Sequence, residues 1–408
     1  MVRKIKDKND KKSNSYTEIH GELQELNIKN FKQFNNVKFT DFDKINIFFG
    51  DNNCGKSSLL EAIFTYACGY NHFPALNQLT GKRDKGIKGF YDYGDKLISI
   101  FKENNESLYE FEISGKFNGV DKEIKTIYSF NPSAELSALD PRNMGYGNIN
   151  FDFAKQQSSE ESQNINGIEN IIPNIPSKYI GQLNIDINNK VKKFDLLFPK
   201  LNITIEKPLK VGAIHDILSH RDTKNDMQIY SHLKRYNILS EMEEEMRKSF
   251  PIVENIDYMP YPDGNSGSIY IRTKDNRNLP LYVFGDGMRR WFYLLGRMIV
   301  SQNSIHCIEE IDATLHFEAQ ENFSANILSY TEKYNNQLFI TSHSIEFADK
   351  FLETLYGDNG VLKGKKEDPV RFFSLKSVKT DSGYDLDIWK LSGREAYSKR
   401  QDFGLELR

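Results

Sequence analysis

The segment Gly50-Asp51-Asn52-Asn53-Cys54-Gly55-Lys56-Ser57 decides the fold. It satisfies the pattern G-x-x-x-x-G-K-[ST] at every fixed position. The glycines let the backbone curl so that successive N–H groups face phosphate oxygens, and the helix that follows adds its N-terminal partial positive charge. Lys56 is expected to reach the outer phosphates and the Ser57 hydroxyl to ligate Mg²⁺. The other candidate nucleotide contacts are Gly50, Asn52, Asn53, Cys54, Gly55 and Ser58.

The sequence on both sides of this loop has the pattern that the motif requires. Residues 45–49 are a short, apolar, β-rich run that ends at Gly50, and apolar residues then recur at helical spacing to about residue 68. Upstream, alternating apolar residues over 23–42 predict an antiparallel hairpin. A buried strand, a glycine-bracketed loop and a helix together predict a nucleotide-binding site.

A second group of polar residues lies in the last third of the chain. Residues 304–308 are an expected strand that ends in Glu309 and Glu310, and 337–340 are another that ends just before Thr341-Ser342-His343. Helices are expected at 288–300, 317–330 and 345–355. This β-α-β-α order is typical of a parallel sheet covered by helices. Adjacent carboxylates at a strand end can hold Mg²⁺ and can orient or deprotonate an attacking water.

A further glycine-bracketed turn, Phe284-Gly285-Asp286-Gly287-Met288-Arg289-Arg290, opens the helix expected at 288–300. Two glycines before a helix usually mark a plain turn. This turn gains significance from its order in the chain, since it falls between the phosphate loop and the acidic strand.

Taken together, these motifs resemble the ABC-type ATPase heads of the RecF, SMC and OLD group. The resemblance covers about residues 23–69 and 268–356. It rests on the loop, the turn and three further segments, which are L-N-I-K-N-F-K-Q-F from residue 26, E-E-I-D-A-T-L-H from 309 and T-S-H-S-I-E-F from 341. It implies an α/β P-loop NTPase fold of the ABC-ATPase head type. Such a fold has a mixed sheet with flanking helices, an N-terminal antiparallel hairpin layer and, here, an α/β insertion.

The resemblance also implies roles for residues. Glu309 would be the Walker B acid that holds Mg²⁺, Glu310 the catalytic base and His343 the switch histidine, with 312–316 as the D-loop region. The turn from Gly285 to Met288 would be the signature turn, which contacts the γ-phosphate of ATP held by a second subunit.

Three features depart from the pattern of that group. Glu309 stands where Asp is usual, and Gly285 stands where the signature serine is usual. Recognition of the phosphate would then rest on backbone N–H groups of the turn, including Gly287, and on Arg289 or Arg290. Gln78 is the candidate for the Q-loop glutamine.

Composition limits the class of protein. The chain has 408 residues, with 54 Lys+Arg against 57 Asp+Glu and a net charge of −3, which excludes a strongly basic protein that coats nucleic acid. No apolar run approaches the roughly 18 residues of a membrane helix, and the N-terminus is not a secretory signal. The three cysteines form no CxxC pair, so neither a disulfide framework nor a zinc site is expected. We expect a cytoplasmic protein.

The expected organisation is a flexible tail at 1–20, an ATPase core made of 21–69 and 268–408, and an insertion at 70–267. Within the insertion, alternation predicts strands at 97–101, 108–117 and 124–130. Composition indicates a loop at about 132–178, and helical spacing predicts one helix or a pair of helices at 226–249. Short strands are also expected at 268–272 and 279–283. A final hairpin at 370–378 and 384–391 leads into a charged tail, and the signature-like segment 391–395 is read as a turn at the end of a strand.

Several classes of ABC-type ATPase fit this organisation poorly. A transporter subunit would have a shorter insertion, and a long-armed SMC protein would show sustained heptads. The nuclease domain of OLD enzymes needs more residues than follow His343, so Asp385-Leu386-Asp387 is read as part of an exposed acidic hairpin.

A stand-alone ATPase therefore remains. It is similar to ATPase subunits of bacterial anti-phage systems of the Septu and PARIS type. That resemblance implies a sensor or switch that forms an ATP-bridged dimer or higher homo-oligomer and acts with a separately encoded nuclease or toxin. The alternative is a RecF-like repair ATPase that binds DNA directly, for which the basic N-terminus and Lys82-Arg83-Asp84-Lys85 are candidate contacts.

Overall fold

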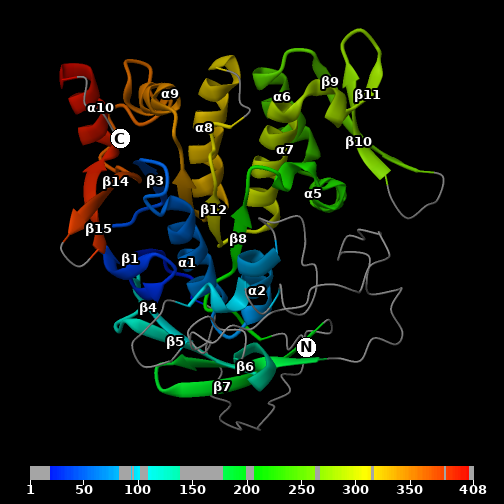
Figure 1. The fold of residues 1–408 in the computed structure, drawn as a ribbon. Coiled ribbons are helices and arrows are strands. Elements are labelled where there is room, and N and C mark those ends of the chain that lie inside the picture. The colour runs from blue at the N-terminus through cyan, green and yellow to red at the C-terminus, as the bar shows by residue number, and fades with distance from the viewer. Residues whose placement is uncertain are drawn as a thin grey trace, which may run out of the picture.

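The computed structural model describes residues 19–81, 93, 96–101, 109–137, 178–198, 206–261, 267–313, 317–380 and 383–403. Within these residues the chain forms two six-stranded sheets and one three-stranded sheet. Figure 1 shows the antiparallel sheet at the bottom, α1 and α2 above it, the central sheet next, and a layer of helices at the top. Most of the expected tail at 1–20, most of the expected loop at 132–178 and the cluster at 82–85 lie outside the described residues.

The central sheet has the strand order β15-β14-β3-β13-β12-β8. Its bounds are β3 (Ile45–Gly50), β8 (Gly212–His215), β12 (Ile305–Ile308), β13 (Gln337–Thr341), β14 (Val370–Thr380) and β15 (Gly383–Ser392). All neighbours are parallel except β14 and β15. Every residue of β3, β12 and β13 is buried, as in parallel strands covered on both faces. Because Phe48 pairs with Thr341 and Ile340 with Ile308, the carboxyl ends of these strands meet at one edge.

The antiparallel sheet forms the second layer. Its order is β2 (Phe34–Phe39), β1 (Leu23–Phe31), β4 (Tyr109–Phe117), β5 (Ile124–Pro132), β6 (Lys178–Ile187) and β7 (Lys190–Phe198). Helix α1 (Lys56–Cys68) lies between the two sheets, in contact with β8 and β12 on one side and with β1 and β4 on the other. This position explains why α1 is buried on nearly all sides. Two short helices, α2 (His72–Gly81) and α4 (Ala134–Ser137), complete this half.

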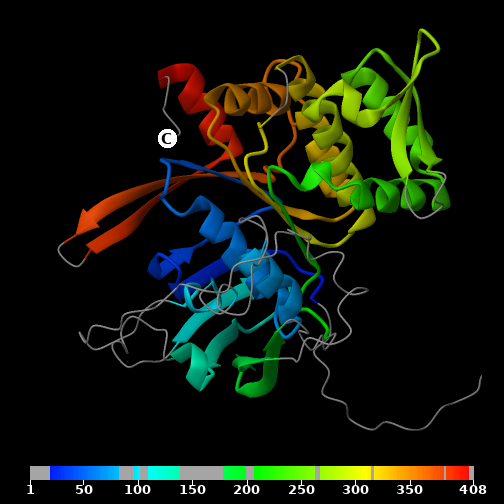
Figure 2. The same ribbon diagram turned by 45° about the vertical axis from the view of Figure 1, so that its right-hand side comes forward.

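The other face of the central sheet carries a second hydrophobic cluster. Its helices are α5 (Thr223–Arg235), α6 (Leu239–Ser249), α7 (Asp286–Val300), α8 (Phe317–Lys333) and α9 (Ile345–Tyr356). The three-stranded sheet is β9 (Val253–Pro260), β10 (Gly267–Thr273) and β11 (Asn278–Pro280), and two 3₁₀ turns are η2 (Ser219–Arg221) and η3 (Leu281–Phe284). Figure 2 shows this sheet on one side of the molecule and the β14–β15 hairpin reaching out on the other.

Three expectations for the segment at 70–267 need revision. The expected strand at 97–101 is wrong, because residues 96–98 are helical, and Leu97, Ile100 and Phe101 are buried at the i, i+3, i+4 spacing of a helix. The strands β6, β7 and β9 were not expected. Strand β8 also comes from this segment, yet it pairs with β12 and belongs to the central sheet.

The ends of two other expected elements differ as well. The strand expected at 279–283 stops early, since β11 ends at Pro280 and a 3₁₀ turn follows. The expected charged tail is instead helix α10 (Gly393–Phe403). Ser392 and Glu395 form a capping box: Ser392 N–H donates to Glu395 Oε2 (2.8 Å) and Glu395 N–H to Ser392 Oγ (3.3 Å). The signature-like segment 391–395 is therefore a helix start.

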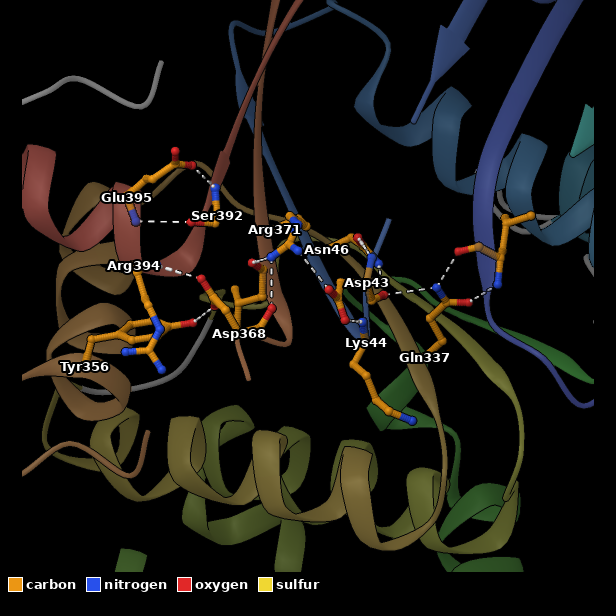
Figure 3. A network of polar contacts seen from close by, with 12 residues as sticks. Asp43, Lys44, Asn46, Gln337, Tyr356, Asp368, Arg371, Ser392, Arg394 and Glu395 are labelled. Atoms are coloured by element: carbon orange, nitrogen blue, oxygen red, sulfur yellow. Dashed lines mark hydrogen bonds and ion pairs between the residues drawn. The ribbon is translucent and has the colours of Figure 1, made fainter. Parts of the chain in front are cut away.

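A polar network holds together the amino ends of the central strands (Figure 3). The Gln337 side-chain amide donates to the carbonyls of Leu23 (2.7 Å) and Asp43 (3.0 Å), and Arg371 pairs with Asp43 at 3.0 Å. Asp368 accepts a hydrogen bond from the Tyr356 hydroxyl (2.5 Å). Structural polar groups thus occupy this edge, and the candidate functional residues lie at the opposite one.

Candidate active site

The phosphate loop links β3 to α1 and depends on its two glycines. Gly50 has φ 140° and Gly55 has φ 100°, values that favour glycine. A Cβ atom would lie 2.1 Å from the Leu375 carbonyl oxygen at position 50, and 2.5 Å from Gln33 Nε2 at position 55. Gly55 is also the N-cap of α1 and offers no side-chain acceptor there. The first N–H groups of α1 are thus suited to an anionic ligand.

The ammonium of Lys56 lies inside the loop. Lys56 is only 6% exposed, and its Nζ donates to the carbonyls of Gly50 and Asp51, both at 2.7 Å, with Cys54 Sγ at 3.7 Å. Burial lowers the pKa of Lys56, while the Cys54 thiol and the carboxylates of Asp51 and Glu310 act in the opposite direction. A buried cation held mainly by neutral carbonyls fits the binding of polyphosphate.

The turn between β1 and β2 supports the loop from outside, a role that the sequence did not reveal. Gln33 Nε2 donates to the Asn53 carbonyl (3.3 Å), and Gln33 Oε1 accepts from the Ser58 hydroxyl (3.2 Å). Lys32 Nζ pairs with Glu61 Oε2 of α1 at 2.6 Å. The Ser58 side chain, expected at the nucleotide, is therefore turned toward the hairpin.

Glu309 and Glu310 lie at the same edge of the sheet as the loop. Glu309 is buried, and its N–H donates to the His215 carbonyl (2.9 Å). Glu310 has φ 45°, in the left-handed region, and its N–H donates to Thr341 Oγ1 (3.0 Å). The register of β3, β13 and β12 brings the end of β12, where the two glutamates lie, to the edge that carries the loop.

His343 follows β13 beside the loop strand. The Ser342 N–H donates to the Phe48 carbonyl (3.2 Å), which fixes this segment next to the end of β3. His343 itself is half-buried. Lys56, Glu310 and His343 are thus brought to one edge of the sheet from three strand ends, as the sequence predicted.

The glycine turn before α7 belongs to a different part of the molecule. Gly285 is exposed with φ 84°, and a Cβ atom there would meet no atom within 4 Å. Asp286 pairs with Arg221, and His220 Nε2 lies 3.2 Å from its carboxylate. These interactions lower the pKa of Asp286. Within the described residues, no hydrogen bond or ion pair joins this turn to the phosphate loop of the same chain.

The two arginines after the turn have different environments. Arg289 is half-buried near Asp226, whose pKa is raised to about 7 by burial despite the opposing charge of Arg289. Arg290 is only 1% exposed, and its guanidinium points into the protein, to the carbonyls of Ile217, Glu309 and Glu310. The expectation that Arg290 could bind phosphate from a second subunit is therefore wrong, because the side chain is buried and its two Nη groups already donate to carbonyls of the same chain.

Two other expected site regions are less well supported. Gln78 is buried in α2, and among the described residues no hydrogen bond joins it to the phosphate loop. Residues 314–316 of the expected D-loop region lie outside the described residues. Asp312 of that region has one buried oxygen, Oδ1, without a hydrogen-bond partner in the described part of the chain.

A cavity of about 370 Å³ adjoins the outer side of the phosphate loop. Its walls come from the loop, the β1–β2 hairpin and the β14–β15 hairpin: Asn52, Asn53, Cys54; Gln33, Phe34, Asn35, Val37; Ser377, Asp385, Leu386. It combines apolar surfaces with side-chain amides, the chemistry that suits a heterocyclic base. Asp385 and Asp387 are exposed on β15.

Alkylation of the loop cysteine is expected to block ATP binding. All three cysteines are buried, but Cys54 alone among them borders this cavity. Burial raises the pKa of Cys68 to about 12 and also raises the pKa of Cys307. N-ethylmaleimide should therefore add once, at Cys54, and ATP should protect it. Mass spectrometry and calorimetric titration measure both effects. The control Cys54→Ser should bind ATP and resist the reagent, while an alkylated wild type with unchanged affinity would contradict the prediction.

Comparison with known proteins agrees with this geometry. Residues 45–349, more than half of the chain, match the family described as "AAA domain, putative AbiEii toxin, Type IV TA system". A curated "ATP/GTP phosphatase" of Helicobacter pylori is 25% identical over 344 residues, which is 80% of this chain and 86% of that protein. The "DNA replication and repair protein RecF" of Idiomarina loihiensis is 35% identical over 79 residues, but these are only 19% of this chain and 22% of RecF.

Among solved structures, an SMC head domain from Thermotoga maritima covers 90% of this chain and 99% of its own, with 11% identity and a TM-score of 0.44. The Smc head domain with an extended coiled coil from Pyrococcus furiosus covers 94% of this chain and 99% of its own, with 11% identity and a TM-score of 0.48. None of the helices in the described residues is long and apolar enough to cross a membrane. The chain belongs to the AAA-domain family that it matches and is an ATPase.

Proposed function

We propose that this ATPase uses the edge formed by the phosphate loop, Glu309-Glu310 and His343 to bind and hydrolyse MgATP, and that it serves as a nucleotide-controlled switch. The observation that supports this best is the meeting of Lys56 and Glu310 from distant parts of the chain at one sheet edge. The loop would cradle the phosphates with its N–H groups, and Lys56 would leave the carbonyls of Gly50 and Asp51 to bind them.

The other residues have separate tasks in this proposal. Ser57 and Glu309 would hold Mg²⁺, which when bound neutralises charge on the phosphate oxygens. Glu310 would orient and deprotonate the attacking water, and His343 would donate a hydrogen bond to the γ-phosphate. The cavity beside the loop would take the base and ribose.

The exposed turn before α7 would complete the site of a second copy. Gly285, Gly287 and Arg289 would contact the γ-phosphate held by Lys56 of the partner, so that two ATP molecules bridge two chains. This assignment is supported by the exposure of Gly285 and by the open space around it, since a Cβ atom there would meet no atom within 4 Å.

Replacing Gly285 with alanine is expected to weaken ATP-dependent association at least about tenfold, with the affinity of the single chain for ATP unchanged. The added methyl group would strain a backbone at positive φ and hold the partner's phosphate away from the turn. Sedimentation with and without ATP measures the effect in the Glu310→Gln background, where hydrolysis is slow. Gly364→Ala is a matched control, because Gly364 also has positive φ (74°) and open space around it. Equal association of the two variants would exclude this contact.

We further propose that the switch acts in anti-phage defence with a separately encoded nuclease or toxin. The description of the matching family names a toxin and a toxin–antitoxin system, which supports a role in defence. The near-neutral net charge of the chain supports a protein partner over DNA. Co-purification with the products of neighbouring genes, in the presence and absence of ATP, tests this proposal. The alternative is a RecF-like role, to which the partial RecF matches point. It predicts instead that the purified chain alone binds DNA in a salt-dependent way.

A further inference from the structure

Arg290 makes an unusual set of contacts for a buried cation. It lies in the first turns of α7, where Nη1 donates to the Ile217 carbonyl (3.0 Å) and Nη2 to the carbonyls of Glu309 (2.6 Å) and Glu310 (2.9 Å). These acceptors follow two neighbouring strands, β8 and β12. One side chain from α7 thus ties together the backbone at the carboxyl ends of both strands.

A packing role alone does not account for an arginine here. Burial lowers the pKa of Arg290, although the carboxylates of Asp312, Asp216 and Glu310 oppose that shift. Moving a charged group out of water is unfavourable, and an apolar side chain of similar size would fill the same space without that penalty. The property that only arginine supplies is a rigid fork of donors able to reach several acceptors at once.

The residue held in this way has a strained backbone. Glu310 has φ 45°, a left-handed conformation that is unfavourable for a residue with a Cβ atom. Such strain persists where the surroundings over-determine the conformation. Here Thr341 Oγ1 accepts a hydrogen bond from the Glu310 N–H. Arg290 donates to the Glu309 carbonyl, which precedes the strained residue, and to the carbonyl of Glu310 itself.

We propose that Arg290, together with Thr341, is a positioning residue that fixes the direction of the Glu310 carboxylate and links it to α7. The inference rests on the proposed role of Glu310 as the base. Because α7 begins at the turn that would contact the partner's ATP, a shift of this helix on association would move Arg290 and, with it, the two carbonyls around Glu310. Hydrolysis in one chain would thereby depend on the engagement of its own turn.

Arg290→Lys is expected to lower kcat about 10- to 100-fold while the Kd for ATP changes less than threefold. A lysine keeps the charge but cannot span three carbonyls, and a displacement of a catalytic group by about 1 Å can reduce a rate about 100-fold. Arg297→Lys is the matched control on the same helix, since Arg297 is only partly buried and contacts Gln228 Oε1 at 3.4 Å. The control should retain wild-type kcat.

A double-mutant cycle separates positioning from general damage to the fold. In the Glu310→Gln background, Arg290→Lys should lower turnover no further, because the group that it positions is already inactive. The inference fails if the double variant loses turnover by the full product of the two single-variant losses. It also fails if Arg290→Lys leaves kcat unchanged. Unchanged turnover in Glu310→Gln alone would instead overturn the proposed function.

A second pair of variants covers the case in which Arg290→Lys does not fold. Thr341→Val keeps the shape of the side chain but removes the acceptor for the Glu310 N–H, and Thr341→Ser retains that acceptor. Valine should reduce kcat at least about tenfold with little change in ATP affinity, and serine should stay within about threefold of wild type. Equal losses in both variants would contradict the positioning role.

Discussion

Replacing Lys56 with alanine is expected to weaken nucleotide binding at least about 100-fold and to abolish ATP hydrolysis. Each charge-assisted hydrogen bond to a phosphate contributes roughly 1.5–3 kcal/mol, and the ammonium would make more than one of them. Lys56 lies at the centre of the loop, with its Nζ 2.7 Å from two carbonyl oxygens and only 6% of the residue exposed. Calorimetric titration with ATP and Mg²⁺, and release of phosphate, measure the two losses.

The variant should remain folded, which makes the experiment decisive. Burial lowers the pKa of Lys56, so the charged ammonium is less stable in the folded protein than in the unfolded chain. Removing it should therefore change the melting temperature little, whereas the increase in melting temperature that ATP gives the wild type should disappear. Lys38→Ala, at an exposed position on β2, is a control that should retain this increase. Normal hydrolysis by Lys56→Ala would overturn the assignment of the loop.

The parts of the site predicted from sequence are those whose signal is local. The strand, loop and helix around Lys56 are encoded within one short stretch, where apolar residues, glycines and helical spacing all agree. Glu309, Glu310 and His343 were predicted to share a site because they follow strands of an expected parallel sheet, and the register of β3, β13 and β12 brings these strand ends to one edge. Their roles in the site stay predictions.

The supporting residues could not be predicted, because their partners are distant in sequence. Arg290 reaches the carbonyls of Glu309 and Ile217, and Gln33 reaches the loop from the hairpin. A side chain that donates to a backbone carbonyl leaves no pattern in the partner's sequence, since every residue has a carbonyl. The position of β8 could not be predicted either, because its four residues show little periodicity and join the edge of the central sheet only through pairing with β12.

The signature-like segment at 391–395 shows how a short motif can mislead. A serine followed three residues later by a glutamate also encodes a capping box, and Ser392 and Glu395 satisfy each other's N–H groups in that way. The order of motifs along the chain excluded the signature reading correctly, but local propensity alone did not show that the charged residues after Gly393 form a helix.

Replacing Glu310 with glutamine is expected to slow hydrolysis at least about 100-fold while ATP still binds. A general base contributes typically a factor of about 10²–10⁴ to the rate, and the neutral amide cannot accept a proton from water. Glutamine has nearly the same shape, so the backbone contacts of Glu310 with Thr341 and Arg290 can persist. Single-turnover hydrolysis and ATP titration, measured on the same preparation, separate the rate of chemistry from binding.

The same variant should accumulate in the ATP-bridged state, because slow hydrolysis keeps the phosphate that both chains contact. Wild-type protein with ATP should associate and then dissociate as ATP is consumed, whereas Glu310→Gln should stay associated. Glu346→Gln, on α9 close after His343, is a matched control that should behave as the wild type, since Glu346 is exposed in the first turn of its helix. If Glu310→Gln turns over ATP at the wild-type rate, another group activates the water. The strained backbone at residue 310 would then have a structural cause only, since it would no longer serve to direct a catalytic carboxylate.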